Sequence, residues 1–200
     1  MPARSHETRE RILDEAELLF ARRGVQGTTT REIVEASGQR NASAVTYHFG
    51  SREALLLEVL ARRGAPVDER RGEMRAGLGA EPPTADLVRC LVEPYLALLA
   101  HGGGRSYLRV VAQLRGRFAA WRVESDVATT KNLASILDEL EQRPPVDEAA
   151  AGERLVAMIM LLTASAAERA RLLDERRRPT LAEGDFVDNL VAMCTAVLEA

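Results

Sequence analysis

The stretch TTTREIVEASGQRNASAVTYHFGS, residues 28–51, decides the fold. Thr29, followed three residues later by Glu32, is typical of a capping box, in which each side chain satisfies a free backbone donor of the other residue. A short helix is therefore predicted to begin here and to end at Gly38. A second short helix is predicted over residues 41–49. Two short helices joined by a tight, glycine-containing turn indicate a helix-turn-helix, whose second helix fits the major groove of DNA.

The outward face of the second helix carries short hydrogen-bonding groups. Such groups can reach base edges or phosphate oxygens without adding bulk charge. An ordinary solvated helix face has the same composition, and the spacing alone does not separate the two interpretations. The residues concerned are Asn41, Ser43, Thr46, Tyr47 and His48.

Longer helices are predicted on both sides of this pair. The preceding helix ends at Gly24, where a left-handed residue is wanted. The following helix is capped by Ser51 and is predicted to run past Pro66, with a kink, toward Leu78. Its ending at Pro66 is the alternative. The apolar residues of the preceding helix recur at helical spacing: Ile12, Leu13, Ala16, Leu19 and Phe20.

The rest of the chain also favours helix. Aromatic residues make up 4% of the sequence, and no stretch has the alternation of a strand. We expect an all-α fold of about nine helices. Thr84 is predicted to cap one helix, and residues 101–104 to form a loop. The last three helices are predicted over residues 121–142, 148–175 and 181–199.

The N-terminal quarter resembles the DNA-binding domain of the TetR (AcrR-like) family of bacterial regulators. The resemblance implies an all-helical homodimer that reads double-stranded, palindromic operator DNA through residues 1–52. It further implies that residues 53–200 form a helical domain for dimerisation and for an unknown small-molecule effector that releases the DNA. The matching segments are Thr8–Leu13, Leu19-Phe20, Gly24, Thr28–Ile33, Ala36–Gly38 and Tyr47–Leu56.

The resemblance also assigns DNA contacts residue by residue. It implies phosphate contacts at both ends of the motif and base contacts early in the second helix. Counting from Gly38 to the His48-Phe49 pair, however, the chain has one residue more than the usual spacing, so the register of the base contacts stays open. The predicted contact residues are Thr28, Thr29, Thr30, Arg31, Arg40, Asn41, Ala42, Ser43, Ala44, Thr46, Tyr47, His48, Ser51 and Arg52.

The effector pocket is expected among the helices that follow the helix-turn-helix. Apolar and amphipathic residues of these helices are candidates for its lining, although plain core packing explains each of them as well. The candidates are Met74, Leu87, Cys90, Tyr95, Tyr107, Trp121 and Met158. No cofactor is implied.

The last two helices are the candidate dimer interface. Their apolar stripes are broad, and small residues such as Ala164 and Ala167 allow another helix to approach closely. Two helices from each subunit would form a four-helix interface. Packing within one chain is the alternative. The candidate interface residues are Leu155, Ile159, Leu162, Ala166, Phe186, Leu190, Met193 and Val197.

Other function classes find little support in the sequence. A catalytic site is not expected, because the histidine and three glycines at 101–104 lack a Gly-x-Ser-x-Gly nucleophile motif to work with. Three scattered histidines and two distant cysteines predict no metal site. Buried Cys90 and Cys194, a polar N-terminus and an apolar run of only 155–167 indicate a cytoplasmic protein outside the membrane. A helical scaffold without DNA-binding activity remains an alternative.

Overall fold

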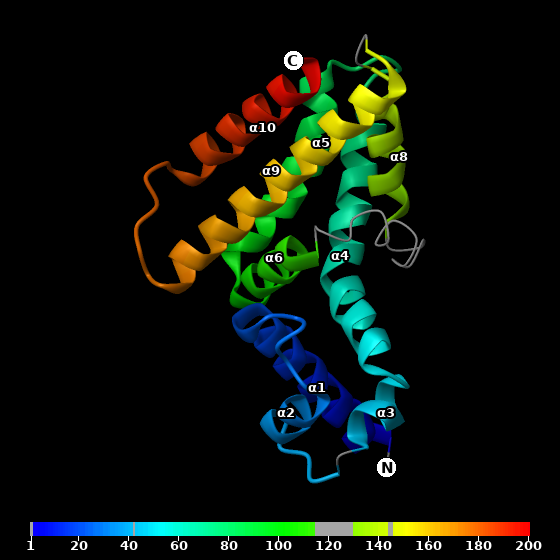
Figure 1. The fold of residues 1–200 in the computed structure, drawn as a ribbon, viewed down its shortest axis with the longest axis vertical. Helices are drawn as coiled ribbons and strands as arrows, with labels where there is room; N and C mark the ends of the chain where they lie inside the picture. Colours follow the sequence, from blue (N-terminus) through cyan, green and yellow to red (C-terminus); the bar gives the residue numbers. More distant parts are fainter. Residues whose placement is uncertain (1, 42, 115–129, 144–145) are drawn as a thin grey trace.

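The computed structural model describes residues 2–41, 43–114, 130–143 and 146–200, with side chains from Ser5 onward. Within these ranges the chain forms helices and connecting loops without a strand, which confirms the predicted all-α class (Figure 1). The elements are α1 (Pro2–Arg23), α2 (Thr30–Ala36), α3 (Ala44–Phe49), α4 (Arg52–Ala76), α5 (Thr84–Leu96), the 3-10 helix η1 (Ala97–Ala100), α6 (Gly102–Leu114), α8 (Lys131–Glu141), α9 (Glu148–Asp174) and α10 (Glu183–Glu199).

The first three helices and the start of α4 enclose a small core at one end of the molecule (Figure 1). Phe20, Ile33 and Leu55 are fully buried there, and they come from three different helices. The side chains predicted to face inward from α1 and α3 do so, including Val45 and Phe49. This core holds the helix-turn-helix as a unit.

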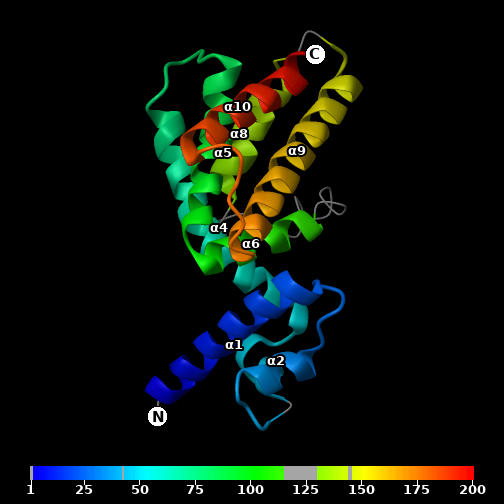
Figure 2. The same ribbon diagram turned by 90° about the vertical axis from the view of Figure 1, so that its left-hand side faces the viewer.

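A larger core fills the other end of the molecule. It is built from α5, α6, α8, α9 and α10 together with the second half of α4 (Figure 2). Leu91, Ile136 and Met158 are among its fully buried members. Cys90 and Cys194 lie in it as free thiols, and burial raises the pKa of Cys194 to about 12, so this thiol stays protonated.

Two helices, α4 and α6, belong to both cores. On α6, Tyr107 and Leu108 lie in the larger core, whereas Val110 lies in the smaller one. One turn further on, the side chain of Gln113 accepts a hydrogen bond from the backbone N–H of Val25 (2.8 Å) and donates one to the carbonyl of Phe20 (3.1 Å). The C-terminal end of α1 is thus fastened to α6.

Most of the predicted helix ends are confirmed. The Thr29 hydroxyl accepts from the N–H of Glu32, and the Glu32 carboxylate accepts from the N–H of Thr29, which completes the capping box. Gly24 and Gly38 have positive φ angles, 91° and 71°. The hydroxyl of Ser51 accepts from the N–H of Ala54 (3.0 Å) and caps α4.

The predicted loop at residues 101–104 is wrong, because Gly102, Gly103 and Gly104 form the first turn of α6. Gly104 is needed here for close packing. A Cβ atom at this position would lie 2.1 Å from the carbonyl oxygen of Leu98, which belongs to the preceding η1. Glycine at position 104 therefore allows the first turn of α6 to pack directly against η1.

Two further helix boundaries differ from the predictions, and the predicted course of α4 is confirmed. α3 begins at Ala44, after the predicted start at residue 41, and α5 has Pro83 at its N-cap, so Thr84 is not the cap. α4 continues through Pro66 to Ala76, and the alternative ending at the proline is wrong. Of the helix predicted over residues 121–142, the described part is α8.

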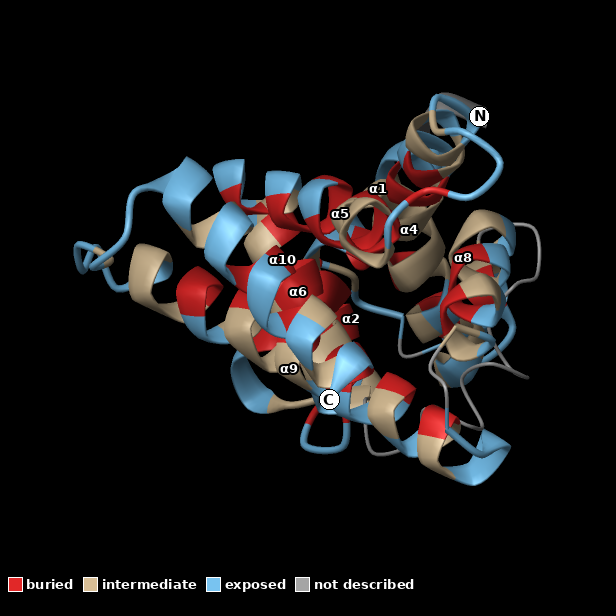
Figure 3. Ribbon diagram, turned by 90° about the horizontal axis from the view of Figure 1, so that it is seen from above, coloured by how far each residue is buried: buried red, intermediate tan, exposed pale blue. Residues whose placement is uncertain are grey.

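α9 is long and apolar enough, by length and composition, to cross a membrane, which the sequence prediction missed. Core helices of globular proteins pass the same test. Only 33% of its most apolar window is buried within the chain. A partly uncovered apolar face is therefore present on this helix, beside the buried face that Figure 3 shows in red.

Candidate nucleic-acid interface and ligand cavity

The turn between α2 and α3 is fixed by local hydrogen bonds. The Ser37 hydroxyl donates to the carbonyl of Val34 (2.9 Å), and the N–H of Gln39 donates to the same carbonyl (3.0 Å). This pattern, with Gly38 in a left-handed conformation between them, terminates α2 and reverses the chain. The turn does not depend on DNA for its shape.

The extra residue of the motif is accommodated ahead of α3. The Asn41 side-chain oxygen accepts from the N–H of Ser43 (3.0 Å), and its carbonyl accepts from the N–H of Ala44 (3.0 Å). Asn41 thus closes the turn from which α3 starts. The extension lengthens the turn and leaves a six-residue α3.

The outer face of α3 is formed by Ser43, Thr46 and Tyr47, which are exposed at helical spacing. Tyr47 is 79% exposed, an unusual position for a large aromatic side chain. His48 beside it is half-buried, and the two rings meet edge to face with centroids 4.9 Å apart. Arg40 is also exposed, in the turn.

The start of α2 presents Arg31 and Thr30 near this face. The Arg31 side chain is 85% exposed and pairs with Glu35 (2.7 Å) on the next turn of the helix. The hydrogen bond from Arg31 to Glu35 raises the pKa of Arg31. Exposed pairs of this kind are weak, so phosphate oxygens can take the place of Glu35.

Three of the predicted DNA contacts need correction or fall outside the structure. Thr28 is 2% exposed, and its hydroxyl donates to the carbonyl of Gly24 (2.9 Å), so it supports the loop after α1. Ala44 is 6% exposed and packs in the small core. Ala42 lies outside the described residues.

Arg52 has a structural role that the sequence did not reveal. Its guanidinium donates hydrogen bonds to the carbonyls of Val25 and Thr28 and lies over the ring of Phe20, 5.4 Å from the centroid. Removing the charge would leave two carbonyls of the loop 24–29 without these donors. In this structure, Arg52 holds the first helix against the fourth.

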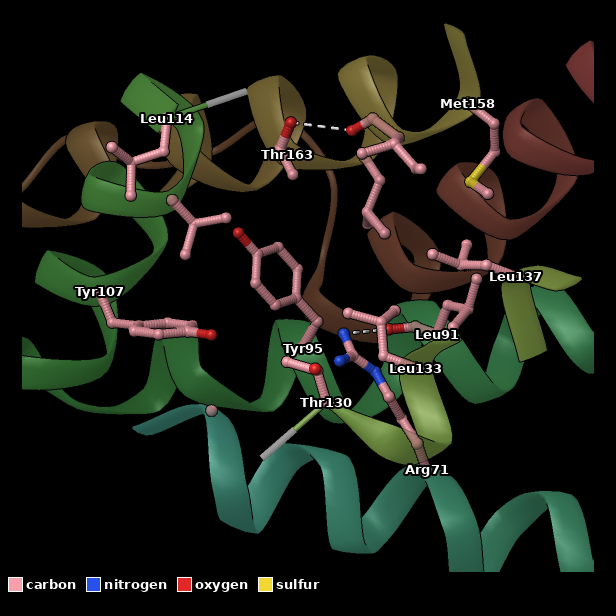
Figure 4. Close-up of a pocket in the computed structure, with 14 residues that line it drawn as sticks. Arg71, Leu91, Tyr95, Tyr107, Leu114, Thr130, Leu133, Leu137, Met158 and Thr163 are labelled. Atoms are coloured by element: carbon pink, nitrogen blue, oxygen red, sulfur yellow. Dashed lines mark hydrogen bonds between the residues drawn. The ribbon is translucent and has the colours of Figure 1, made fainter. Parts of the chain in front are cut away.

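A cavity lies between the long helices of the larger core. It contains about 80 Å³ in which the centre of a water-sized molecule can lie. About 10–15 Å³ is enough for one water, so the cavity has room for a small organic molecule. Its lining is mainly apolar (Figure 4) and consists of Gly64, Arg71, Leu91, Tyr95, Tyr107, Val111, Leu114, Thr130, Leu133, Leu137, Met158, Ile159, Leu162 and Thr163.

Three of the predicted pocket residues, Tyr95, Tyr107 and Met158, line this cavity. Leu87 and Cys90 point into the surrounding core and Met74 packs against it, as the alternative of plain core packing proposed. Trp121 lies outside the described residues. The sequence analysis missed Arg71, because it sits in a charge-rich stretch, residues 69–75, that is typical of a solvated helix face.

The candidate dimer residues mostly face their own chain. Their own chain mainly covers Leu155, Ile159, Leu162, Ala166 and Leu190, which are at most 8% exposed. Phe186 and Val197 are half-buried, and only Met193 of the predicted set is exposed. The uncovered apolar residues are instead Val156 and Met160 on α9, together with Met193 on α10.

These features define a class. A compact helix-turn-helix with an exposed polar second helix is joined to a larger helical core with a cavity, and a helix-turn-helix of this kind is suited to the major groove of DNA. The similarity to known proteins lies in this N-terminal region. Residues 12–59 match the family described as bacterial regulatory proteins, tetR family.

Two characterised repressors are similar to the chain. The HTH-type transcriptional repressor AcnR of Corynebacterium glutamicum is 33% identical over 91 residues, which make up 43% of this chain and 48% of AcnR. KstR2 of Rhodococcus jostii, also an HTH-type transcriptional repressor, is 42% identical over 52 residues, 26% of this chain and 25% of KstR2. The chain thus matches about half or less of the length of these relatives.

Solved structures share the fold over almost the whole chain. NalD of Pseudomonas aeruginosa, the secondary repressor of the MexAB-OprM multidrug efflux pump, has a TM-score of 0.61 at 22% identity, covering 96% of this chain and 95% of NalD. A TetR-family regulator from Shewanella sp. PV-4 has a TM-score of 0.63 at 15% identity, covering 94% and 96%. The likeness therefore extends the shared all-α fold beyond the N-terminal region to the larger core.

Proposed function

We propose that the chain is a cytoplasmic, ligand-responsive repressor that binds a palindromic operator as a homodimer and leaves it when a small effector fills the cavity. In this proposal residues 1–52 form the DNA-binding domain and residues 53–200 the effector and dimerisation domain. The observation that carries it is the combination of an exposed aromatic, Tyr47, on α3 with an internal cavity in the same chain.

The DNA contacts that we propose come from the exposed part of the predicted set. Ser43, Thr46 and Tyr47 would enter the major groove, since they share the outer face of α3. Arg31 and Arg40, with the neighbouring polar residues, would bind the phosphates on either side. The remaining proposed contacts are Thr29, Thr30, Asn41, His48 and Ser51.

The uncovered apolar face of α9 and α10 supports dimerisation. Val156, Met160 and Met193 are 38–47% exposed, and the neighbouring Ala192 and Ala196 on α10 are exposed as well. Small residues beside large apolar ones allow helices of two subunits to approach closely. A dimer would place two recognition helices for successive major grooves, about 34 Å apart.

Coupling between cavity and DNA would run through α4 and α6. α4 contributes Gly64 and Arg71 to the cavity and Leu55 to the small core, while α6 contributes Tyr107 to the cavity and Gln113 to the end of α1. An effector that binds better to a differently packed arrangement of these helices would change the separation of the recognition helices. This differential affinity is what would release the operator.

The test of DNA binding begins with selection of duplexes from a random pool, followed by affinity measurements at several salt concentrations. We expect an inverted repeat to be enriched, and its affinity to fall steeply with salt because phosphate contacts release counterions. No enrichment, or an affinity independent of salt, would contradict the proposal and favour a scaffold role.

The test of the dimer is the double variant Val156→Glu with Met160→Glu. Two carboxylates on each face would repel and be desolvated, so we expect a monomer in analytical ultracentrifugation. Leu57→Glu, at an exposed apolar position on α4, is the matched control and should leave the wild-type mass unchanged. A dimeric double variant would show that the interface lies elsewhere.

A further inference from the structure

The cavity contains a buried cation that has no anionic partner within residues 5–41, 43–114, 130–143 and 146–200. Arg71 is 7% exposed, and its Nε atom has no hydrogen-bond partner among the described residues. Its Nη2 atom donates one long hydrogen bond, 3.5 Å, to the carbonyl of Leu91 (Figure 4). Burial lowers the pKa of Arg71, an effect that the nearby Tyr107 and Asp68 partly offset. A buried charge without a partner is costly, which indicates that a group from outside completes the site.

The buried carboxylate one helical turn before Arg71, that of Asp68, is already engaged. It accepts hydrogen bonds from the backbone N–H groups of Leu133 (2.7 Å) and Asn132 (2.9 Å) and from the side chain of Asn132 (3.1 Å). These bonds satisfy the free donors at the start of α8. Asp68 therefore holds α8 against α4 and does not form a salt bridge with Arg71.

A second buried polar atom faces the same space. The hydroxyl of Tyr95 has no hydrogen-bond partner in the described part of the chain, and its ring lies 6.0 Å from the guanidinium carbon of Arg71. Figure 4 shows both side chains directed toward the cavity. Burial raises the pKa of Tyr95 well above its usual value, so the hydroxyl remains a donor at neutral pH.

The remainder of the lining suits an apolar body. Leu133, Leu137, Met158 and Ile159 line the cavity with apolar side chains. Thr163 uses its hydroxyl within α9, where it donates to the carbonyl of Ile159 (2.8 Å). Arg71 is the cationic side chain of this lining. One guanidinium and one hydroxyl match a single negative charge.

We propose that the ligand of this cavity is a small organic acid, a monocarboxylate with an apolar body. Its carboxylate accepts hydrogen bonds from the Arg71 guanidinium and from the Tyr95 hydroxyl, while its apolar part displaces water from the leucine and methionine side chains. The inference rests on the proposed function, which makes this cavity the effector site.

The test compares acids with neutral analogues of the same shape. Benzoate and benzamide, and hexanoate and hexanamide, are titrated into the full chain without DNA and followed by calorimetry. We expect each acid to bind at least about 30-fold more tightly than its amide, because only the acid pairs with the buried guanidinium. Equal affinities within each pair would overturn the proposal, as would a lack of binding by both acids.

Variants locate the interaction. Arg71→Met removes the charge but keeps an apolar stem of similar length, and we expect the preference for acids to disappear. Because the variant removes an unpaired buried charge, its melting temperature should be no lower than that of the wild type. Tyr95→Phe should weaken acid binding about ten-fold, the loss of one hydrogen bond to a charged group. Arg75→Met is the control, since Arg75 pairs with Glu139 (2.8 Å) and does not line the cavity.

Unchanged acid binding by Arg71→Met would also overturn the proposal. A separate measurement of operator affinity, with and without benzoate, distinguishes this failure from that of the proposed function. Acid binding that depends on Arg71 but leaves operator affinity unchanged would support the assigned ligand class and contradict the effector role. Operator release by benzamide as well as by benzoate would support the effector role of the cavity and contradict the assigned preference for acids.

Discussion

The two ends of the molecule differ in the hydrogen bonds of their buried polar side chains. In the smaller core, Arg52 donates to two loop carbonyls, and the hydroxyls of Thr28 and Ser37 donate to carbonyls of nearby turns. In the larger core, Arg71 Nε and Tyr95 Oη have no partner within the described residues. Arg62 Nε, between α4 and α1, has no partner there either, but the Arg62 guanidinium is paired with Asp14 (2.8 Å) and Glu17 (2.5 Å), whereas Arg71 has no such ion pair among the described residues.

This difference matches the size of the partner that we propose for each end. A recognition helix can meet DNA with groups that stay exposed, so its supporting frame can be fully bonded beforehand. The polar groups that bind a small molecule inside a protein are already buried in the ligand-free state. Incomplete hydrogen bonding in a core therefore points to a ligand, whereas an exposed polar group needs no partner from the protein.

The largest expected effect is on the free energy of unfolding, and it comes from a substitution at a tightly packed position of the larger core, Gly104. Gly104→Ala would place a methyl group 2.1 Å from the Leu98 carbonyl, a backbone atom that cannot rotate away. We expect the free energy of unfolding to fall by about 3 kcal/mol in denaturant titrations. Gly184→Ala, where a Cβ would meet nothing within 4 Å, is the control. An unchanged free energy of unfolding for Gly104→Ala would mean that the larger core is loosely packed in general, and not only at its cavity.

The next effect compares the two arginines directly. Arg52→Met deprives the carbonyls of Val25 and Thr28 of a charged donor, so we expect a loss of about 2 kcal/mol in the free energy of unfolding. Arg71→Met should bring no such loss. Denaturant titrations of both variants check the difference, and equal destabilisation would remove the contrast between the two ends. An Arg52→Met variant of normal stability but poor DNA binding would point instead to a phosphate contact.

A smaller effect separates recognition from stability. Tyr47→Ala removes a side chain that is 79% exposed, so the free energy of unfolding should change by no more than about 0.5 kcal/mol. Affinity for DNA should fall about ten-fold, measured by fluorescence anisotropy on the selected duplex. Ser43→Ala is the companion variant, and it should alter the preferred sequence. If DNA binding by Tyr47→Ala is normal, the outer face of α3 is not the contact surface.

The smallest effect concerns the capping box. The backbone N–H of Thr29 lowers the pKa of Glu32 below its usual 4.5, so the ionised form stabilises the folded state. This contribution is present above about pH 4.5 and is lost as the pH falls through the lower pKa of the folded state. Glu32→Gln should therefore be less stable than the wild type at pH 7, and the gap should narrow toward pH 3. A gap that stays constant would exclude the carboxylate charge as its source.

Local features were predictable from the sequence. The capping box at Thr29, the left-handed glycines at 24 and 38 and the cap at Ser51 each depend on a few neighbouring residues, and the structure has all of them. The resemblance in the N-terminal quarter agrees with the family match of residues 12–59. The start of α3 was missed by three residues, because Asn41 closes a turn where its position suggested helix.

Features that depend on distant contacts were not predictable. The most apolar stripe of α9 was predicted to meet a second subunit, but Leu155 and Leu162 are covered by the chain's own helices. Sequence periodicity identifies an apolar face and not the partner that covers it. The burial of Arg71 was not predictable for the same reason. Its neighbours in the sequence do not show that residues of α5, α6 and α9 line the cavity with it.

The hydrogen bond between Gln113 and the backbone of Val25 can be followed by NMR spectroscopy. Its carboxamide oxygen is the acceptor for the backbone N–H of Val25, a residue at the end of α1 and far from the cavity in the sequence. A shift of α6 relative to α1 on ligand entry would stretch or break this bond. The chemical shift and the hydrogen-exchange rate of one backbone amide, Val25, would then report on cavity occupancy without DNA, label or reporter gene.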